Sequence, residues 1–429
     1  MSACAPRTPK VKKFVQAPFV TCPDCGKEGA FGVLMVCDRH YVRRCINCWF
    51  DKSLPLSPIK KRIIYLDQFV ISNMMKELDC KNETGFYRNL FARLDCLSKL
   101  QLIVCPDSPI LDHESIVDTR YEKMRSVFRQ LSNGVSFHDA ITILHAQIMR
   151  AFRCWLTDEP CNADVTRKFA LTKDPDVWQD WYRIELNYTL PGLAQELGTK
   201  SKIVTQRLHE TCQEWQQDNN FSFKETFENE LTGGSKLIWE QYSRYTAHYA
   251  AVATGRVAFD DEVCFPPPGA MLVSRMFSEL SSNLMTSHDD RVAAVLKFFS
   301  SKQFRTVPAA RISALFWATI AREIHAGRKA DRFPTASMYN DIDAVAIYSP
   351  HCDAMFVDKE ISHLVKQREL REELGPTVRF FSLRRDEKSE FLNYLDNIER
   401  SASSEHLRLV EEVYGPDWPT PYVDLLSTR

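Results

Sequence analysis

Two short apolar runs in this sequence each end in an aspartate. Ile63–Leu66 is followed by Asp67, and Ala354–Val357 is followed by Asp358. Runs of this length predict buried strands, and the carboxyl ends of parallel strands lie along one edge of a sheet. Carboxylates gathered there repel one another unless a cation neutralises them, and oxygen ligands suit Mg²⁺ or Mn²⁺. Such a metal can activate water for attack on a phosphodiester, so the pattern indicates metal-dependent hydrolysis.

Further acids lie in two predicted helices. Asp107-Ser-Pro109 is typical of a helix start, and the helix that follows contains Glu114, with Asp112 and Asp118 as alternatives on the same helix. A second helix is expected to start at Asp341, with Asp343 also in its first turn, where the helix dipole favours negative charge.

Three other polar residues have secondary roles in this interpretation. Asp353 precedes a predicted strand and is expected to support a metal ligand or to cap the backbone. Gln68 and Asn73 follow Asp67 and could hydrogen-bond to it or to a phosphate, or simply form a polar helix start.

The cysteines supply a different chemistry. Five of the fourteen fall between Cys22 and Cys48. Two CxxC pairs, nineteen residues apart, provide four thiolates for a tetrahedral structural zinc: Cys22, Cys25, Cys45 and Cys48. Cys37 and His40 lie between the pairs and remain alternative ligands. Basic and aromatic residues of this segment, such as Tyr41 and Arg43, could guide nucleic acid or dock the ribbon onto the rest of the protein.

The elements that position these residues alternate at both ends of the chain. Strands are expected at Ile63–Leu66, Leu102–Cys105, Ala354–Val357 and Val378–Phe381, with a helix over 83–100 and terminal helices over 387–413. Between them, helical patterns dominate, with breaks expected at 158–160, 191–192, 233–234 and 266–269.

The predicted organisation therefore has five parts. They are a flexible leader (1–20), a zinc ribbon (21–50), the first part of an α/β domain with a parallel sheet (60–135), an all-helical insertion (136–327), and the second part of the α/β domain with C-terminal helices (328–429).

The segments YLDQ, PDSPILDHES and NDIDAVAIYSPHCDAMFVD, in this order, resemble the PIN nuclease family. The similarity covers about 60–120 and 330–385. It is strongest to bacterial PIN-like proteins whose late segment has an aspartate, a helix, a proline, Cys-Asp, a strand and a final aspartate.

The resemblance implies a PIN-like nuclease with one or two Mg²⁺ or Mn²⁺ ions. Residue by residue, it assigns metal binding to Asp67, Glu114, Asp341 and Asp358, with Asp343 competing with Asp341 as a catalytic acid. It favours an endoribonuclease over a DNA nuclease, and many members of the family act as toxins or antiphage effectors. The main alternative is a nonenzymatic module whose zinc ribbon binds nucleic acid or protein and whose acids are vestigial.

The composition of the chain narrows the classes of function that remain. The net charge of −1, from 55 basic and 56 acidic residues, argues against nonspecific coating of nucleic acid, so an RNA partner must be held by local basic patches. No apolar run is long enough for a membrane helix and no secretory signal is recognisable, which predicts a cytoplasmic protein. No Walker loop, GxGxxG motif or nucleophile elbow is present. The sequence leaves an oligomer or a regulatory partner protein open.

Overall fold

The computed structural model describes residues 15–79, 85–115, 120–180, 193–282, 287–327 and 333–418. Its centre is a parallel sheet with strand order β6-β5-β7-β8. The strands are β5 (Arg62–Leu66), β6 (Ile103–Val104), β7 (Ala354–Phe356) and β8 (Arg379–Phe381). The predicted α/β class with a parallel sheet is thereby confirmed.

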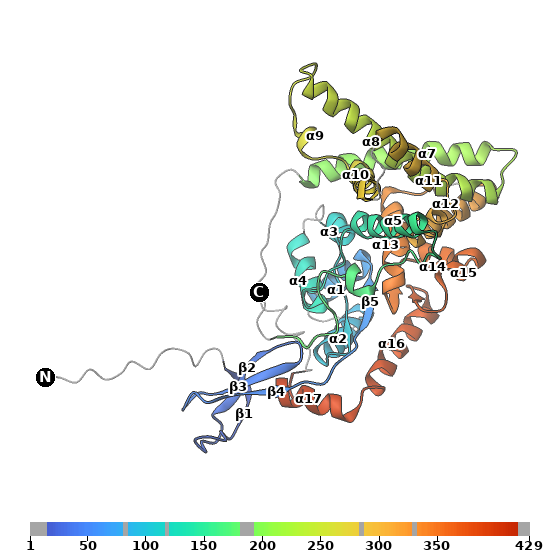
Figure 1. The fold of residues 1–429 in the computed structure, drawn as a ribbon. Coiled ribbons are helices and arrows are strands. Elements are labelled where there is room, and N and C mark those ends of the chain that lie inside the picture. The colour runs from blue at the N-terminus through green and yellow to red at the C-terminus, as the bar shows by residue number, and fades with distance from the viewer. Residues whose placement is uncertain are drawn as a thin grey trace.

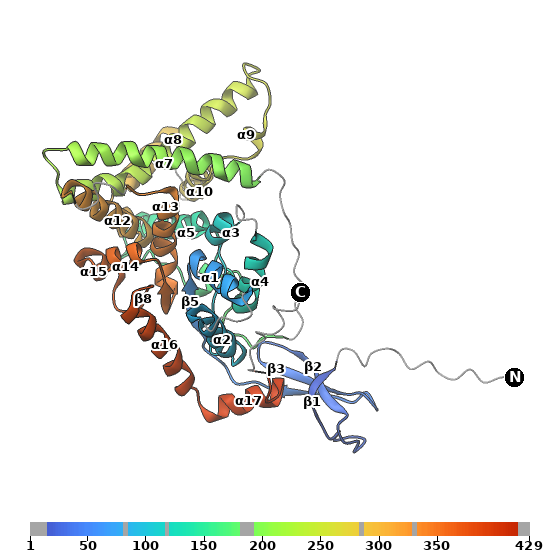
Figure 2. The same cartoon turned by 180° about the vertical axis from the view of Figure 1, so that it is seen from behind.

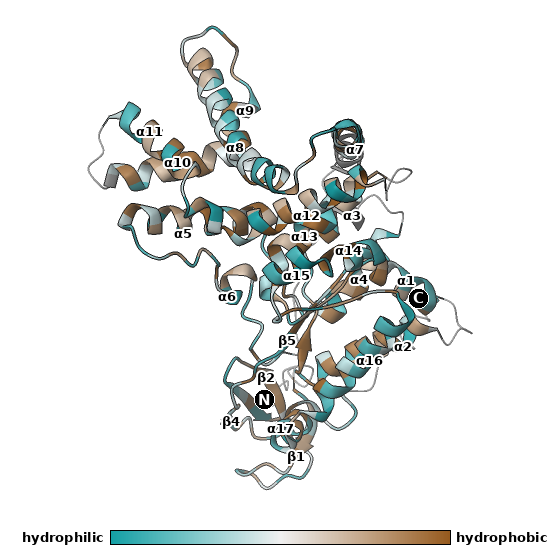
Figure 3. Cartoon of the chain, turned by 90° about the vertical axis from the view of Figure 1, so that its right-hand side faces the viewer, coloured by the Kyte–Doolittle hydropathy of each residue, from teal (hydrophilic) through white to brown (hydrophobic). Residues whose placement is uncertain are grey.

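Helices from both ends of the chain cover this sheet (Figures 1 and 2). They are α1 (Gln68–Asp79), α2 (Phe86–Lys99), α3 (Pro109–Ser115), α4 (Tyr121–Ser132), α13 (Ala336–Tyr348), α14 (Lys359–Val365), α15 (Arg368–Leu374) and α16 (Arg385–Arg400), with a short 3₁₀ turn η3 (Ser349–His351) before β7. The strands read as continuous apolar runs because both faces are buried. Ile63, Ile64, Met355 and Phe356 are fully buried, and Figure 3 shows β5 as a hydrophobic strand at the centre of the fold.

Helices dominate the described residues between 140 and 325, whereas the break predicted at 191–192 lies outside the described residues. Its helices are α5 (Ala140–Thr157), α6 (Arg167–Ala170), α7 (Leu193–Gln217), α8 (Phe223–Ala253), α9 (Asp261–Cys264), α10 (Pro268–Ser282), α11 (His288–Phe299), η2 (Phe304–Thr306) and α12 (Pro308–His325). A second hydrophobic core joins α5, α10 and α11. Helix α12, however, contributes Phe316 and Ile320 to the core of the sheet, so the apolar interior continues from the sheet into this helical part.

Two local predictions for the helices are wrong. Helix α8 runs without a break through Gly233 and Gly234, because packing against α10 and α12 outweighs the cost of about 1 kcal/mol per helical glycine. Helix α13 starts at Ala336 rather than at Asp341: the Thr335 side chain accepts a hydrogen bond from the Met338 N–H and caps it. Asp341 therefore lies in the second turn. In the part of the chain that is described, no helix combines the length and apolarity needed to cross a membrane.

The N-terminal cysteine segment forms a separate antiparallel sheet, β1-β2-β3-β4. Its strands are β1 (Gln16–Val20), β2 (Phe31–Val36), β3 (His40–Cys45) and β4 (Asp51–Pro55). Residues 16–20, predicted as part of a flexible leader, are thus a strand, because they pair with β2. The rest of that predicted leader, residues 1–14, lies outside the described residues. The sheet packs against the last helix, α17 (Ser404–Tyr414), as Figure 1 shows.

Candidate metal centres

Asp67 and Asp358 follow neighbouring strands at the same edge of the parallel sheet. Leu66 pairs with Phe356, and the Asp67 N–H donates to the Phe356 carbonyl at 3.1 Å. Asp67 is therefore level with Val357, one residue before Asp358. Adjacent strands are about 4.8 Å apart, so the sequence places both acids at one point of the carboxyl edge.

This point is also where the strand order reverses. From β5 the chain first adds β6 on one side and later adds β7 and β8 on the other. In open α/β sheets the crevice outside the carboxyl ends at such a switch point is where ligands bind. The switch point here lies between β5 and β7, the two strands that end in Asp67 and Asp358.

Local structure explains how the two acids are held. Asp67 is 7% exposed and lies between β5 and α1. Asp358 is the N-cap of α14, and its Oδ1 accepts the Ile361 N–H at 2.6 Å. A carboxylate has two oxygens with several acceptor positions, so capping does not prevent metal binding.

The helices that carry the other two predicted acids are neighbours of this edge. Helix α3, with Glu114, packs against α1 and α13, and α13, with Asp341, also packs against α14. Among the alternatives to Glu114, Asp112 accepts a hydrogen bond from the Tyr121 hydroxyl at 2.6 Å, whereas Asp118 lies outside the described residues. The side chain of Glu114 lies outside them as well, so only the backbone of α3 is placed.

The structure separates Asp341 from Asp343. Two residues along an α-helix correspond to a rotation of about 200°, so the two side chains leave α13 on different sides. Asp343 lines a cavity between α13 and the helices of the central part. Burial there raises the pKa of Asp343 to about 7.

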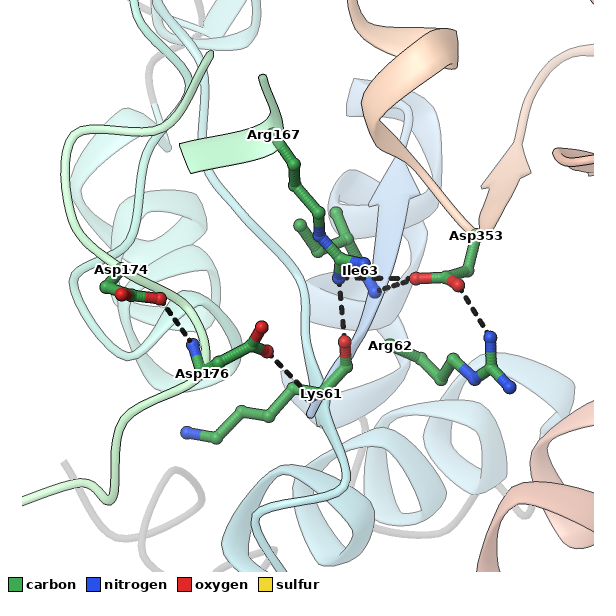
Figure 4. A network of polar contacts seen from close by, with 7 residues as sticks. All are labelled: Lys61, Arg62, Ile63, Arg167, Asp174, Asp176 and Asp353. Atoms are coloured by element: carbon green, nitrogen blue, oxygen red, sulfur yellow. Dashed lines mark hydrogen bonds and ion pairs between the residues drawn. The ribbon is translucent and has the colours of Figure 1, made fainter. Parts of the chain in front are cut away.

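Asp353 lies at the opposite edge of the sheet (Figure 4). Its carboxylate accepts the Ile63 N–H at 2.8 Å, pairs with Arg62 at 2.8 Å and with Arg167 at 3.3 Å. It thus joins the start of β7 to the start of β5, about 16 Å from Asp358 along the strand. Of its two predicted roles, the structure shows the backbone cap. Asn73 likewise has a packing contact: its Nδ2 donates to the Tyr87 hydroxyl at 3.3 Å.

Asp107 was predicted only as part of a helix start. The structure places this aspartate just beyond β6, the third strand at the carboxyl edge. Burial, with a further contribution from nearby Asp112, raises the pKa of Asp107 to about 6, and its Oδ1 accepts the Ser108 N–H. Ser108 is the residue that caps α3, through the Leu111 N–H. The signal available in the sequence was an acid close behind an apolar run: Asp107 is the second residue after Leu102–Cys105, whereas Asp67 and Asp358 follow their runs directly.

The four cysteines of the CxxC pairs converge at one end of the antiparallel sheet. Their ligand atoms all lie within 4.8 Å of one another, with Sγ–Sγ distances of 3.7 Å for Cys22–Cys48 and 3.8 Å for Cys25–Cys45. A zinc ion with four sulfurs at about 2.3 Å separates them by about 3.8 Å in a tetrahedron. The cluster can therefore hold a metal such as zinc. Among the described residues, this is the one group in which three or more Cys, His or carboxylate ligand atoms lie close enough together to hold a metal ion.

Hydrogen bonds to sulfur support the thiolate form. The backbone N–H of Asn47 and that of Cys48 both donate to the Cys45 Sγ. A hydrogen bond from the Lys27 backbone, followed by one from the Asn47 side chain, lowers the pKa of Cys25 to about 6, whereas burial and the neighbouring cysteine sulfurs raise the pKa of Cys48 to about 12. The thiolate is the form that binds metal.

Cys37 and His40, the alternative ligands, lie at the other end of the β2–β3 hairpin. Phe31 pairs with Cys45 near the cluster, and Val36 pairs with Tyr41 next to the turn. Five residue pairs separate the two ends, roughly 16 Å. The structure therefore brings together the two symmetric pairs and leaves Cys37 and His40 apart from them.

Tyr41 and Arg43 dock the ribbon onto α17. The Tyr41 hydroxyl donates to the Glu412 carboxylate, and Arg43, 3% exposed, donates to the Glu412 carbonyl at 2.6 Å. Of the two roles left open for these residues, docking is the one that the contacts show. Arg44 instead pairs at the surface with Asp51.

Compared with models of known families, with curated proteins and with solved structures, the chain gives no match. The PIN-like resemblance therefore stays a prediction.

Proposed function

We propose that the protein is a PIN-like endoribonuclease that depends on Mg²⁺ or Mn²⁺. The observation that supports this most is the position of Asp67 and Asp358. Two acids at the carboxyl ends of the strands that flank a switch point form the arrangement in which α/β folds bind ligands, and clustered carboxylates favour a divalent cation.

In this proposal the metal is held by Asp67, Glu114, Asp341 and Asp358. A divalent ion there supplies a Lewis acid that lowers the pKa of a water and stabilises charge on a phosphodiester. Three contacts support this assignment: the Asp67 N–H pairs with the neighbouring strand, Asp358 caps α14, and α13, which carries Asp341, packs against α3 and α14. Mg²⁺ keeps several waters and often needs only one or two protein carboxylates together with substrate phosphates.

The direct test is cleavage of labelled single-stranded RNA and DNA with Mn²⁺, Mg²⁺ or chelator. We expect metal-dependent internal cleavage of RNA. Asp67→Asn and Asp358→Asn should each lower the rate by about 100-fold or more, because each removes a ligand charge. Folding is checked by circular dichroism. If both variants cleave like the wild type, the metal site is misassigned.

A second pair of variants tests the choice between neighbouring acids. Asp341→Asn is expected to lose cleavage, whereas Asp343→Asn, which changes a residue on another side of α13, should keep most of it. Loss in Asp343→Asn alone would reverse the assignment.

The same experiments separate the rival functions. Cleavage of DNA but not RNA would keep the site and change the substrate. RNA binding without cleavage under any metal would favour a nonenzymatic binding module. A toxin or antiphage role predicts that expression of the wild type, but not of Asp67→Asn, arrests bacterial growth.

We further propose that the cysteine cluster holds a structural Zn²⁺. Four thiolates leave no open position for substrate, and a small sheet with its own core of only a few residues, such as Phe31 and Ala30, depends on metal to fold.

A further inference from the structure

A partly open cavity of about 490 Å³ lies between helices of the sheet domain and of the central helical part. Helices α5, α8, α12 and α13 form its walls, and the start of α10 lies at one side. Most of its lining is apolar, with residues such as Leu144, Ile148 and Leu231. Its size falls within the range of small-molecule sites, which are mostly apolar with a few polar groups.

The charged groups of the cavity are acidic. Asp343 of α13 and Glu230 of α8 both line it. Both acids lie near enough to the hydroxyl of Tyr339, which also lines the cavity, to act on it electrostatically. Among the residues that line the cavity, which all belong to the described part, there is no lysine or arginine.

These two carboxylates are also without a neutralising partner. Within the described residues, neither Asp343 nor Glu230 takes part in a hydrogen bond or an ion pair. His145, on the α5 wall, is neutral at pH 7, because burial lowers its pKa to about 4. It adds a polar contact but no charge.

An aromatic pair completes the wall beside the acids. Trp317 and Tyr339 have ring centroids 5.9 Å apart, and both residues line the cavity. Aromatic faces attract cations, most strongly where water is excluded. Apolar walls, two unpaired carboxylates and an aromatic pair therefore select for the same chemistry.

We propose that this cavity is a binding site for a compact, largely apolar molecule that carries a protonated amine. The apolar part occupies the space between α5, α8 and α12, and the ammonium group lies between Asp343 and Glu230, beside Tyr339. Anionic ligands are disfavoured by the two acids, and a neutral molecule of the same shape leaves both carboxylates without a counter-charge. This inference does not depend on the proposed nuclease activity.

Two adjacent glycines of α8 provide a matched test. Gly234 lines the cavity, and Gly233 does not. A Cβ at either position meets nothing within 4 Å, so both sites accept a side chain without displacing the backbone. Leucine at either position raises helix propensity equally. Only Gly234→Leu, however, places the new side chain at the cavity.

The experiment measures binding of 2-phenylethylamine and tryptamine to the full-length chain by calorimetry, with 2-phenylethanol as the neutral control. We expect the amines to bind with a Kd below about 1 mM, and 2-phenylethylamine to bind about tenfold more tightly than 2-phenylethanol. Gly234→Leu should weaken amine binding at least about tenfold, while Gly233→Leu binds like the wild type.

A second variant tests the charge. Asp343→Asn should remove most of the preference for the amine over the alcohol and leave binding of the alcohol unchanged. The proposal is overturned if neither amine binds, if the alcohol binds as tightly as the amine, or if Gly234→Leu and Gly233→Leu bind alike. Because binding is measured directly, a negative result here leaves the nuclease proposal untouched.

Discussion

The two aspartates that flank β7 are expected to give opposite mutant phenotypes. Asp353 precedes this three-residue strand and Asp358 follows its end closely. Asp353→Asn should lower stability and keep cleavage. Asp358→Asn should abolish cleavage and keep stability. Both changes replace the same acid by the same amide, so each variant is the control for the other.

The contacts of Asp353 set the size of the stability loss. The Arg62 side chain is 57% exposed, so its pair with Asp353 contributes only about 0.5 kcal/mol. The pair with Arg167 is less exposed and contributes about 1 kcal/mol. The Ile63 N–H keeps an acceptor in asparagine but loses the charge, at about 1 kcal/mol. We therefore expect Asp353→Asn to cost about 2–3 kcal/mol, and Asp353→Ala about 4 kcal/mol, because the buried N–H then has no acceptor.

Asp358→Asn should change stability by less than about 0.5 kcal/mol, since asparagine caps a helix as well as aspartate does. Urea unfolding followed by circular dichroism measures both values. With a slope of about 3 kcal/mol per molar, Asp353→Asn shifts the midpoint down by about 0.7–1 M. An unchanged midpoint for Asp353→Asn, or an equal drop for Asp358→Asn, would refute the assignment of one acid to structure and the other to chemistry.

Three further outcomes follow from the described contacts. Purified protein should contain one zinc per chain. The Cys25→Ser variant should lose this zinc and show faster hydrogen exchange in β2 and β3, because the ribbon depends on the metal to fold. A folded ribbon without zinc would contradict the assignment. Burial and the hydrogen bond to Glu412 raise the pKa of Tyr41 to about 12. Tyr41→Phe should therefore lower the free energy of unfolding by about 1 kcal/mol and remove a phenol that ionises above pH 11. The contact is disproved if the ultraviolet titration of the wild type, after subtraction of that of the variant, has its midpoint near pH 10. Burial raises the pKa of Asp107 to about 6, so this carboxyl loses its proton at lower pH in the unfolded chain than in the folded one, and the folded state loses stability as pH rises from about 4 to 6. In the absence of metal, Asp107→Asn should therefore be more stable than the wild type by roughly 2 kcal/mol at pH 7 and equal to it below pH 4. The prediction is excluded if the denaturant midpoints of variant and wild type differ by the same amount at both pH values.

Features that depend on neighbours in the sequence were predictable. The CxxC pairs each form one turn of chain, and their spacing is enough to indicate a four-sulfur site. The strands before Asp67 and Asp358 were recognisable because a buried parallel strand is a continuous apolar run. The two aspartates were expected to be neighbours because the carboxyl ends of parallel strands lie along the same edge of a sheet.

Features that depend on distant contacts were not predictable. The strand β4 begins Asp51-Lys-Ser and has no apolar pattern, because it lies at the exposed edge of the ribbon. Asp341 was placed at a helix start because acids favour that position, but Thr335, six residues earlier, supplies the cap. The cavity that separates Asp343 from Asp341 is made by helices up to two hundred residues away, and no local pattern contains it.

The pairing of β5 with β7 has a consequence for synthesis of the chain. Leu66 and its partner Phe356 are 290 residues apart, so β7 leaves the ribosome long after β5. At about 5–20 residues per second, this delay is roughly 15–60 s. During that time β5, apolar from Ile63 to Leu66, has β6 beside it but an open edge on its other side, a surface that pairs readily with foreign strands. We expect nascent chains stopped before residue 354 to need a chaperone to remain unaggregated.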